Sequence, residues 1–430
     1  DPVGRLLEAN SRVGRETFAF DPAGNIVDPP ATNDPLRHPA GKLLDNLLKN
    51  YAGTSYRYDE RGNMTERVSN GWRTVFAWDG FNRMTAATDQ SGITTSFSYD
   101  ALGRRLSKSS GETTTLFGWD GDVLAFESTQ SKSAMEEGGE HGWSVHYIHE
   151  ANSFVPLVQV RQARAMALSE TTDAKALMEA NGGVYDIEQD PLWNGEQRQV
   201  PRAFDRKEMA FYQCDHLGTP QELTDHEGSV AWSAQYKAWG EAREAISEAG
   251  RRAGLRNPVR FQGQYWDEET GLHYNRYRYY DPQAGRFVSK DPIKLAGGNN
   301  IYQYAPNPIR WFDPLGLIKL GYDKNDKSWS TPNGLIYGQG SAHGNRIKHV
   351  LEHESPDANK STHSVFCTCK RGGSLDLVDE AWAKRGQPLA NDPGAYVIPM
   401  GRAVGTNGEK NIKLITRPGT NRVITAYPVN

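Results

Sequence analysis

Two aspartates with the same local sequence are the first candidates for chemistry in this chain. Asp291 and Asp313 are each followed by proline and lie close together in the sequence. Where two carboxyl groups share one site, both cannot easily ionise, so one keeps its proton and acts as an acid. The other, as a carboxylate, can take a proton from a water that attacks a peptide carbonyl. An Asp-Pro pair is also an ordinary turn former, so the spacing alone leaves both interpretations open.

Histidines near the C-terminus suggest a second chemistry, the metal-free cleavage of RNA. That reaction needs a base for the 2′-hydroxyl proton, an acid for the leaving oxygen, and a cation for the charge that develops on phosphate. Two histidines of near-neutral pKa and one lysine or arginine supply this set. We predict His349 and His363 as the leading pair. The supporting candidates are His353, a cation from Lys360, Lys413 or Arg417, and the two last-strand residues Thr425 and Tyr427.

The same region also permits zinc chemistry. His349, Glu352 and His353 match the pattern H-x-x-E-H, in which both histidines bind zinc and the glutamate activates water. That interpretation needs a third, downstream ligand. The candidates are Asp376, Asp379 and Glu380.

The charge of the chain changes sign after Leu317. From Ile318 to Asn430 there are 15 Lys+Arg and 10 Asp+Glu, a net charge of +5, and four of the eleven histidines. The part from Asp1 to Leu317 holds the remaining 34 and 43, a net charge of −9. A basic region behind an acidic one favours a polyanionic substrate. This favours an RNase over a zinc peptidase, with a DNase as a further alternative, and no cofactor is expected.

The acidic part is built from a short repeat in which an aromatic residue is followed by aspartate. The units begin at Phe20, Tyr58, Trp78, Tyr99 and Trp119, and the last four recur with a period of about 20 residues. Asp-x-x-Gly is a turn sequence, because the aspartate bonds its own turn backbone and glycine accepts positive φ. Each unit therefore predicts strand, turn and strand, and neighbouring units must stack into one sheet.

Residues 130–205 interrupt this pattern. They predict an irregular insertion in which Ala163 to Asn181, rich in Ala, Leu, Met and Glu, forms one exposed helix. Repeat-like strands resume near Phe211.

Several motifs between Asp1 and Leu317 together resemble the Rhs/YD-repeat family. They are the Tyr-Asp repeats, DHLGTP at 215–220, RFQGQY at 260–265, YRYYDP at 277–282, GRF at 285–287 and DPLGL at 313–317. In that family the repeats wind into a closed β-shell around a C-terminal toxin, and the core that plugs the shell cuts the toxin free. The resemblance implies cleavage of the Leu317–Ile318 bond by Asp291 and Asp313, with Arg278 positioning one carboxylate.

The resemblance also implies an organisation and a set of partners. The chain would be mainly β, with a repeat shell (1–240), an associated core with the cleavage site (241–317) and a small enclosed α+β toxin (318–430). The expected partners are RNA, a cognate immunity protein, type VI or related secretion and chaperone proteins, and a preceding part of the same protein. The toxin would be secreted and act in the cytoplasm of a target bacterium. No stretch approaches the roughly 20 apolar residues that span a bilayer.

The C-terminal tail, residues 318–430, is predicted to form two helices followed by a small antiparallel sheet. The elements are a helix around His349, a helix from Leu375 to Lys384, and strands at 396–398, 412–415 and 423–427. This order resembles the small BECR-type toxin RNases (barnase, EndoU, colicin E5/D and RelE-like). Thr362 stands where the EndoU pattern has glycine before the second histidine, and the ending also differs, which leaves the subfamily and the catalytic cation open.

A different class of function, a non-enzymatic repeat scaffold for adhesion, is compatible with the Tyr-Asp repeats alone. The intact pair Asp291 and Asp313, the boundary sequence DPLGL and the reversal of charge behind it favour the self-cleaving toxin instead.

Overall fold

The chain is mainly β, as predicted. The computed structural model describes residues 1–2, 4–28, 44–131, 142–150, 153–166, 178–189, 204–294, 300–317, 320–323, 326, 328–331, 333–340, 344–351, 353, 364–367 and 374–430. Its largest element is a 15-stranded sheet in which every strand pairs antiparallel with its neighbours in sequence. Its strands are β5 (Asn50–Tyr51), β6 (Thr54–Tyr58), β7 (Met64–Ser69), β8 (Trp72–Trp78), β9 (Met84–Thr88), β10 (Thr94–Tyr99), β11 (Arg105–Ser110), β12 (Thr113–Asp120), β13 (Val123–Ser131), β14 (Gly142–His149), β15 (Pro156–Gln162), β16 (Met209–Cys214), β17 (Pro220–Thr224), β18 (Val230–Tyr236) and β19 (Ala242–Ile246).

Hydrogen bonds within each repeat hold its turn, and a further hydrogen bond joins it to the previous repeat, as the turn at Asp100 shows. The Gly103 N–H donates to the Asp100 carbonyl at 3.0 Å, and the Arg104 N–H donates to the Asp100 carboxylate at 2.8 Å. Gly103 has φ +78°, which a side chain would disfavour. The Tyr99 hydroxyl donates to the Met84 carbonyl of the previous repeat at 2.7 Å. These bonds explain why the repeat is recognisable in the sequence.

The predicted insertion is narrower than expected, because β14 and β15 are regular strands of the sheet. The predicted helix from Ala163 to Asn181 is wrong at its start: residues 163–166 are not helical. Ala165 is 3% exposed, and the Met166 N–H donates to the Ser128 hydroxyl of β13 at 2.8 Å, so tertiary contacts override the local helix preference here. Residues 178–180 are helical, and 167–177 lie outside the described residues.

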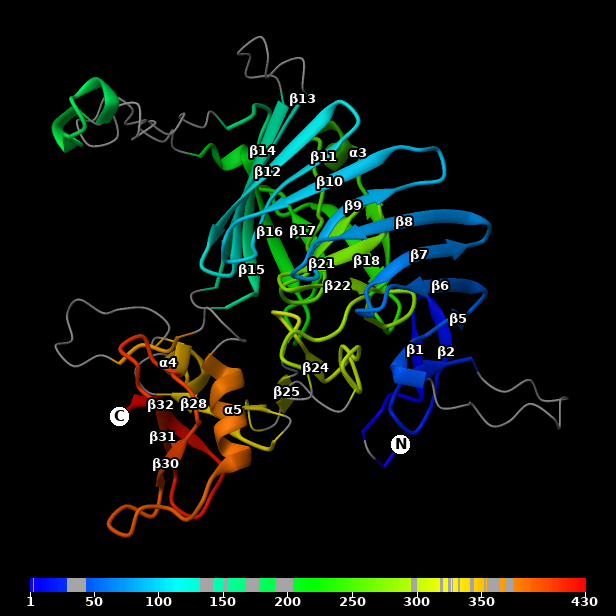
Figure 1. Cartoon of the computed structure of the whole chain (residues 1–430). Coiled ribbons are helices and arrows are strands. Elements are labelled where there is room, and N and C mark those ends of the chain that lie inside the picture. The colour runs from blue at the N-terminus through cyan, green and yellow to red at the C-terminus, as the bar shows by residue number, and fades with distance from the viewer. Residues whose placement is uncertain are drawn as a thin grey trace, which may run out of the picture.

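The sheet curls around a small four-stranded core, as Figure 1 shows for β21 and β22. The core strands are β20 (Tyr265–Asp267), β21 (Leu272–Asn275), β22 (Arg278–Asp281) and β23 (Arg286–Phe287). Every residue of β21 and β22 is buried, and one hydrophobic cluster joins apolar side chains of β20 to β22 with those of the sheet. The core is therefore packed inside the curve of the sheet.

A buried ion pair fastens this core to the sheet. Arg105 of β11 contacts Asp267 of β20 through two bonds of 2.5 and 3.0 Å, and both side chains are fully buried. The Arg105 guanidinium lies 4.4 Å from the ring centroid of Tyr274 and 4.6 Å from that of Phe117. The charge is thus paired, hydrogen-bonded and enclosed by aromatic rings, the conditions under which a buried cation is tolerated.

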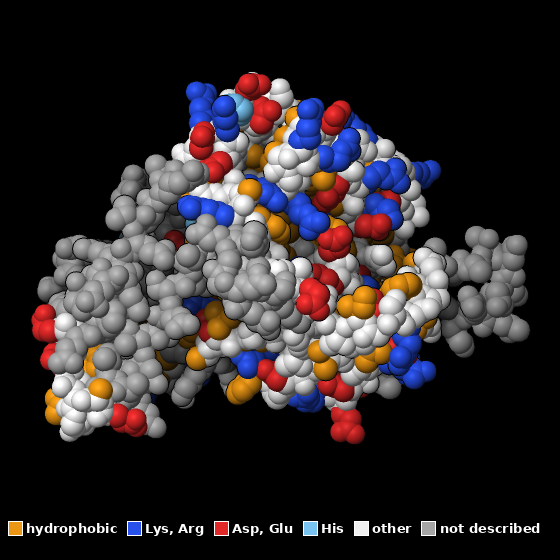
Figure 2. Space-filling view, turned by 90° about the horizontal axis from the view of Figure 1, so that it is seen from above, with side chains coloured by type: hydrophobic (Ala, Val, Ile, Leu, Met, Phe, Trp, Pro, Cys, Tyr) orange, Lys and Arg blue, Asp and Glu red, His pale blue; other side chains and the backbone are white. Residues whose placement is uncertain are grey.

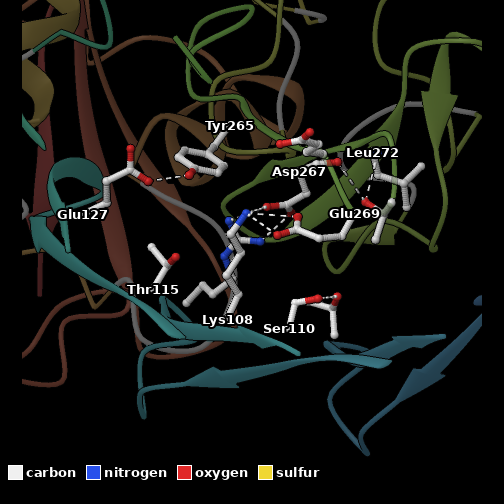
Figure 3. A network of polar contacts seen from close by, with 12 residues as sticks. Lys108, Ser110, Thr115, Glu127, Tyr265, Asp267, Glu269 and Leu272 are labelled. Atoms are coloured by element: carbon white, nitrogen blue, oxygen red, sulfur yellow. Dashed lines mark hydrogen bonds and ion pairs between the residues drawn. The ribbon is translucent and has the colours of Figure 1, made fainter. Parts of the chain in front are cut away.

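Further polar contacts surround the ion pair (Figure 3). Lys108 of β11 lies 3.0 Å from Glu269 and 3.5 Å from Asp267. Glu127 of β13 accepts hydrogen bonds from the Tyr147 and Tyr265 hydroxyls, and burial raises the pKa of its carboxyl group. The network therefore connects β11, β13 and β14 with β20.

The tail forms an α+β domain with the predicted helices and strands. They are α4 (Arg346–Leu351), α5 (Ser374–Lys384), β30 (Ala395–Pro399), β31 (Asn411–Thr416) and β32 (Val423–Val429). The sequence did not reveal a second sheet that crosses the predicted boundary. Its strands are β24 (Trp311–Phe312), β25 (Leu320–Asp323), β26 (Ser328–Ser330) and β27 (Ile336–Tyr337), in that order. One strand before Leu317 thus pairs with the first strand after it.

The tail lies to one side of the sheet, next to β24, in Figure 1. The 15-stranded sheet has a linear order with β5 and β19 at its edges, so enclosure of the tail by a closed shell stays a prediction. The remaining short elements are β1 (Glu8–Ser11), β2 (Gly14–Thr17), β3 (Ala19–Phe20), β4 (Ile26–Val27), α3 (Glu248–Arg252), β28 (Gln339–Gly340) and β29 (Gly344–Asn345). In the described ranges, none of the helices has the length and apolar character that crossing a membrane requires.

We expect the Asp267→Ala substitution to lower the free energy of unfolding by about 3–5 kcal/mol, because it leaves the Arg105 charge buried and unpaired. Equilibrium denaturation of the whole chain measures this. The matched control is Lys237→Ala, which breaks a surface pair with Glu241 and should cost below about 1 kcal/mol. Equal effects of the two substitutions would contradict the role given to the buried pair.

Candidate functional sites

Arg278 contacts both predicted catalytic carboxylates. Its Nη2 lies 3.0 Å from Asp291 Oδ2 and 3.3 Å from Asp313 Oδ2. The three side chains are 3% exposed or less. The structure thus brings together residues that the sequence separates by up to 35 positions. One guanidinium therefore contacts both carboxylates at once, as a site that uses the two groups together requires.

Strand ends and short loops of the core place these groups. Arg278 begins β22, and its guanidinium lies 3.6 Å from the ring centroid of Phe287 in β23. Asp291 follows β23, and its N–H donates to the Ile301 carbonyl at 2.9 Å. Asp313 follows β24 directly. The two Asp-Pro sequences are turns as well as site residues, so the two interpretations of the sequence do not exclude each other.

The loop Asp313–Leu317 folds back on its own aspartate. The Leu317 N–H donates to Asp313 Oδ1 at 2.8 Å, and the Arg278 Nε donates to the Gly316 carbonyl. Leu317 is 1% exposed. Asp313 and Arg278 therefore both contact the backbone immediately before the predicted cleavage point. Ile318, the other half of the predicted bond, lies outside the described residues.

Two residues that the sequence did not single out also shape this loop. A Cβ on Gly263 would lie 1.8 Å from the Pro314 carbonyl oxygen, so backbone meets backbone there. The Asn275 side chain donates to the Asp313 carbonyl at 2.8 Å. Gly263 lies inside the motif RFQGQY and Asn275 lies just before YRYYDP, and only the fold identifies their individual contacts.

The loop and its surroundings are suited to hydrolysis of one peptide bond. Two carboxylates with a common cation can activate water and protonate a leaving amine, and Asp313 and Arg278 reach the backbone at Leu317 and Gly316. Burial and the nearby Asp313 charge raise the pKa of the Tyr304 hydroxyl, so the phenol beside this carboxylate is neutral.

In the tail, two of the predicted histidines meet next to the last strand. The rings of His349 and His353 have centroids 6.3 Å apart, and the His353 ring stacks on Tyr427 of β32 at 5.6 Å. The His353 Nδ1 lies 2.9 Å from the Ser364 carbonyl and donates to it, which leaves Nε2 for other contacts. His363, the residue before Ser364, lies outside the described residues, as do Lys360 and Glu352.

The candidate cations differ in their position on the sheet. Lys413 of β31 stands directly opposite Tyr427, and Ile415 stands opposite Thr425, so Thr425, Tyr427 and Lys413 share one face. Arg417 is exposed and lies in the turn after β31. Four residues of extended chain place it about 13 Å from Lys413. Lys413 is therefore nearer along the sheet than Arg417 to Tyr427, the residue on which the His353 ring stacks.

Two of the proposed zinc ligands are engaged elsewhere. Asp379 accepts hydrogen bonds from the Thr331 hydroxyl and, at 2.9 Å, from the Asn333 amide. Glu380 pairs with Arg402 and Lys384, and these hydrogen bonds lower the pKa of its carboxyl group to about 2. Within the described parts of the chain, no three His, Cys, Asp or Glu side chains are grouped as a metal site requires.

Comparison with known proteins identifies two segments of the sheet. Residues 209–246 match the family model described as RHS protein, and residues 78–115 match the model described as RHS Repeat. The first segment covers β16 to β19, and the second runs from the last residue of β8 into the start of β12.

Three relatives extend the similarity. "Double-stranded DNA deaminase toxin A" of Burkholderia cenocepacia is 35% identical over 324 residues, 74% of this chain and 20% of that protein. "Toxin protein Tse5" of Pseudomonas aeruginosa is 37% identical over 275 residues, 64% of this chain and 19% of that protein. "Probable deoxyribonuclease RhsA" of Dickeya dadantii is 44% identical over 113 residues, 26% of this chain and 8% of that protein. The chain spans a fifth or less of the length of these relatives.

Asp379 predicts a pH dependence of tail stability. Burial raises the pKa of its carboxyl group from 3.8 to about 6. The folded state then binds the proton more tightly than the unfolded state, so the stabilisation is complete below about pH 4 and lost as pH rises through 6. The difference corresponds to about 3 kcal/mol. Asp379→Asn should remove this slope, so the variant should gain stability relative to the wild type between pH 4 and 7 in denaturant unfolding. A difference between variant and wild type that does not change with pH would contradict the assignment.

Proposed function

Because this chain belongs to the Rhs-repeat family, we propose that it is part of a secreted Rhs toxin that cleaves itself between Leu317 and Ile318. The observation that carries the proposal is the contact of Arg278 with Asp291, Asp313 and the Gly316 carbonyl at once. The toxin relatives support the class of function, and their matches cover 74% and 64% of this chain. Competition between bacteria is the setting that we infer.

In the proposed cleavage, the aspartate pair carries both proton transfers. One carboxylate takes a proton from water, and the water oxygen attacks the Leu317 carbonyl carbon. The protonated partner gives its proton to the Ile318 nitrogen, and the carbon–nitrogen bond breaks. The products are a Leu317 carboxylate and an Ile318 amine, and the proton taken from water restores the pair. Arg278 holds the two carboxylates and the preceding carbonyl in register during these steps.

After cleavage, we expect the tail to stay bound through the sheet that crosses the boundary. Trp311 and Phe312 of β24 pair with Gly321 and Leu320 of β25, on the other side of the cut. Leu217 and Phe312 also belong to the hydrophobic cluster that forms the tail core. The face of the molecule seen in Figure 2 carries acidic and basic side chains interspersed. Strand pairing and apolar burial across the boundary therefore support retention.

We propose further that the released tail is a metal-independent endoribonuclease. His349 and His363 are the proposed acid and base, and His353 holds the chain beside His363 through Ser364. Lys413 is the cation that we favour, because it stands opposite Tyr427 on the face that His353 covers. The tail's net charge of +5 suits a phosphate backbone. An immunity protein, a secretion apparatus and a preceding part of the protein are the partners that the proposal implies.

A DNA substrate is the second candidate. Two relatives carry names that refer to DNA, one a double-stranded DNA deaminase and the other a deoxyribonuclease. Their tails need not resemble this one, because each match covers a fifth or less of the relative. Zinc peptidase activity through His349, Glu352 and His353 is the third candidate.

We expect the chain to appear as two fragments on a denaturing gel, Asp1–Leu317 and Ile318–Asn430, and to elute from a native sizing column as one species. Asp291→Asn and Asp313→Asn should each leave one full-length band, because either substitution removes a proton carrier. Asp225→Asn, in a repeat turn remote from the site in sequence, is the matched control and should cleave normally. A new N-terminus at Ile318 in the double Asn variant would overturn the aspartate assignment.

The released tail should cut total RNA in the presence of EDTA and leave 2′,3′-cyclic phosphate ends, since the 2′-hydroxyl is the proposed nucleophile. His349→Ala and His363→Ala should each lower the rate by about 10²–10⁴-fold. His343→Ala alters a tail histidine outside the proposed set and should keep the activity. Loss of activity in EDTA with recovery in zinc would instead support the peptidase motif residues as metal ligands, and cleavage of DNA alone would support the second candidate.

A further inference from the structure

The strands β21 and β22 present alternate side chains to two different partners. Tyr274 and Tyr279 face the sheet, where the Tyr274 hydroxyl accepts from the Arg105 N–H at 3.1 Å and the Tyr279 hydroxyl accepts from its guanidinium at 3.2 Å. Their neighbours Asn275 and Arg278 face the loop before the cleavage point. Because side chains alternate along a strand, fixing one face on the sheet also fixes the other face on the loop.

Asn275 contacts this loop at a peptide group that can form few hydrogen bonds. The peptide between Asp313 and Pro314 has no N–H, since proline lacks one, so its carbonyl oxygen is its only hydrogen-bonding group. That oxygen accepts from Asn275 Nδ2 at 2.8 Å, and from the Gly316 N–H at the longer distance of 3.4 Å. Asn275 is fully buried. The Asn275 amide is therefore the stronger of these two restraints on the orientation of this peptide plane.

The orientation of this peptide plane determines how the loop after Asp313 turns back toward the Asp313 side chain. Asp313 Oδ1 must reach the Leu317 N–H at 2.8 Å while Oδ2 reaches Arg278 at 3.3 Å. A rotation of the plane about the Asp313 Cα–C bond would move the chain after Asp313, and with it the Leu317 N–H, away from the carboxylate. The loop also passes tightly over Asn275, because a Cβ on Gly316 would lie 2.8 Å from the Asn275 carbonyl oxygen. Side chain and backbone of one residue thus shape the loop at two points.

We infer that Asn275 is a positioning residue for self-cleavage, which holds the loop before the cleavage point against the Asp313 carboxylate through the Asp313–Pro314 carbonyl, without touching the reacting atoms. This inference rests on the proposed cleavage at Leu317. Asn275 supplies a neutral N–H donor that stays a donor at every pH at which the aspartate pair can work.

Two substitutions separate this role from a purely structural one. Asn275→Ala removes the donor and should slow cleavage by about 10²-fold, the usual effect of misplacing a reacting group by about 1 Å. Asn275→Asp keeps the shape but offers a hydrogen-bond donor only when the new carboxyl group is protonated. Its rate relative to the wild type should therefore rise as pH falls. Because an ionised carboxylate buried at this position would also weaken the fold, the rates are compared only at pH values where the variant shows the thermal transition of a folded chain. There, a residue that merely supports the fold would give a ratio that does not change with pH.

The experiment uses the full chain, Asp1–Asn430, made by a short pulse of cell-free translation and then diluted into buffers from mildly acidic to neutral pH. The rate of appearance of the Ile318–Asn430 fragment is read from a denaturing gel. Asn63→Ala removes a buried asparagine amide that bonds Asp59 in a repeat turn at 2.9 Å. It is the matched control and should cleave at the wild-type rate.

The outcomes distinguish the two proposals. If the wild type cleaves and Asn275→Ala cleaves at the same rate, the positioning role is overturned and self-cleavage stands. If Asn275→Ala does not fold, as judged by its thermal transition against that of Asn63→Ala, the isosteric Asn275→Asp decides by its pH ratio. A ratio that is constant with pH overturns the role. If the wild type gives no fragments, the proposed cleavage fails, and the role of Asn275 fails with it.

Discussion

The fully buried ion pair between Arg105 and Asp267 is the interaction on which the rest of the structure depends. It joins the long sheet to the small core at a point where no water reaches, so its energy depends on both partners being present together. Aromatic rings from the sheet and the core enclose the guanidinium. The Arg105 charge is therefore compensated only when the core is packed inside the curve of the sheet.

The geometry of the candidate cleavage site follows from this arrangement, because successive side chains of a β-strand point to opposite faces. The faces of β21 and β22 that carry Tyr274 and Tyr279 bind the sheet, and the opposite faces carry Asn275 and Arg278 to the loop at Asp313. A charge placed at the end of a strand that is buried on both faces has little freedom to move. The precision that a pair of carboxylates needs is thus supplied by the docking of the core and not by the loop itself.

The tail is an α+β unit that shares one sheet and part of its hydrophobic core with the preceding part of the chain. Its three C-terminal strands and α5 enclose one apolar cluster, while its first strand, β25, pairs with β24 of the preceding part. A cut between these strands would break the chain and leave the pairing intact. The histidine group next to β32 lies in the same unit, so the tail combines a candidate catalytic surface with a strand that attaches it to the shell.

The sequence by itself determined the features that depend on neighbours in the chain. The Asp-x-x-Gly turns, the strands between them and the helices and strands of the tail were predictable, because their hydrogen bonds and apolar spacing are local. The residues Arg278, Asp291 and Asp313 were identified through family motifs, and their contacts agree with a shared site. Tertiary structure alone decided the pairing of Arg105 with Asp267 across 162 residues, the contact of Asn275 with Asp313, and the sheet that crosses the boundary. It also overrode the helix expected from Ala163, because burial of Ala165 against the sheet outweighs a weak local preference. Pairings between distant residues depend on which surfaces the folded chain brings together, and no local pattern encodes that.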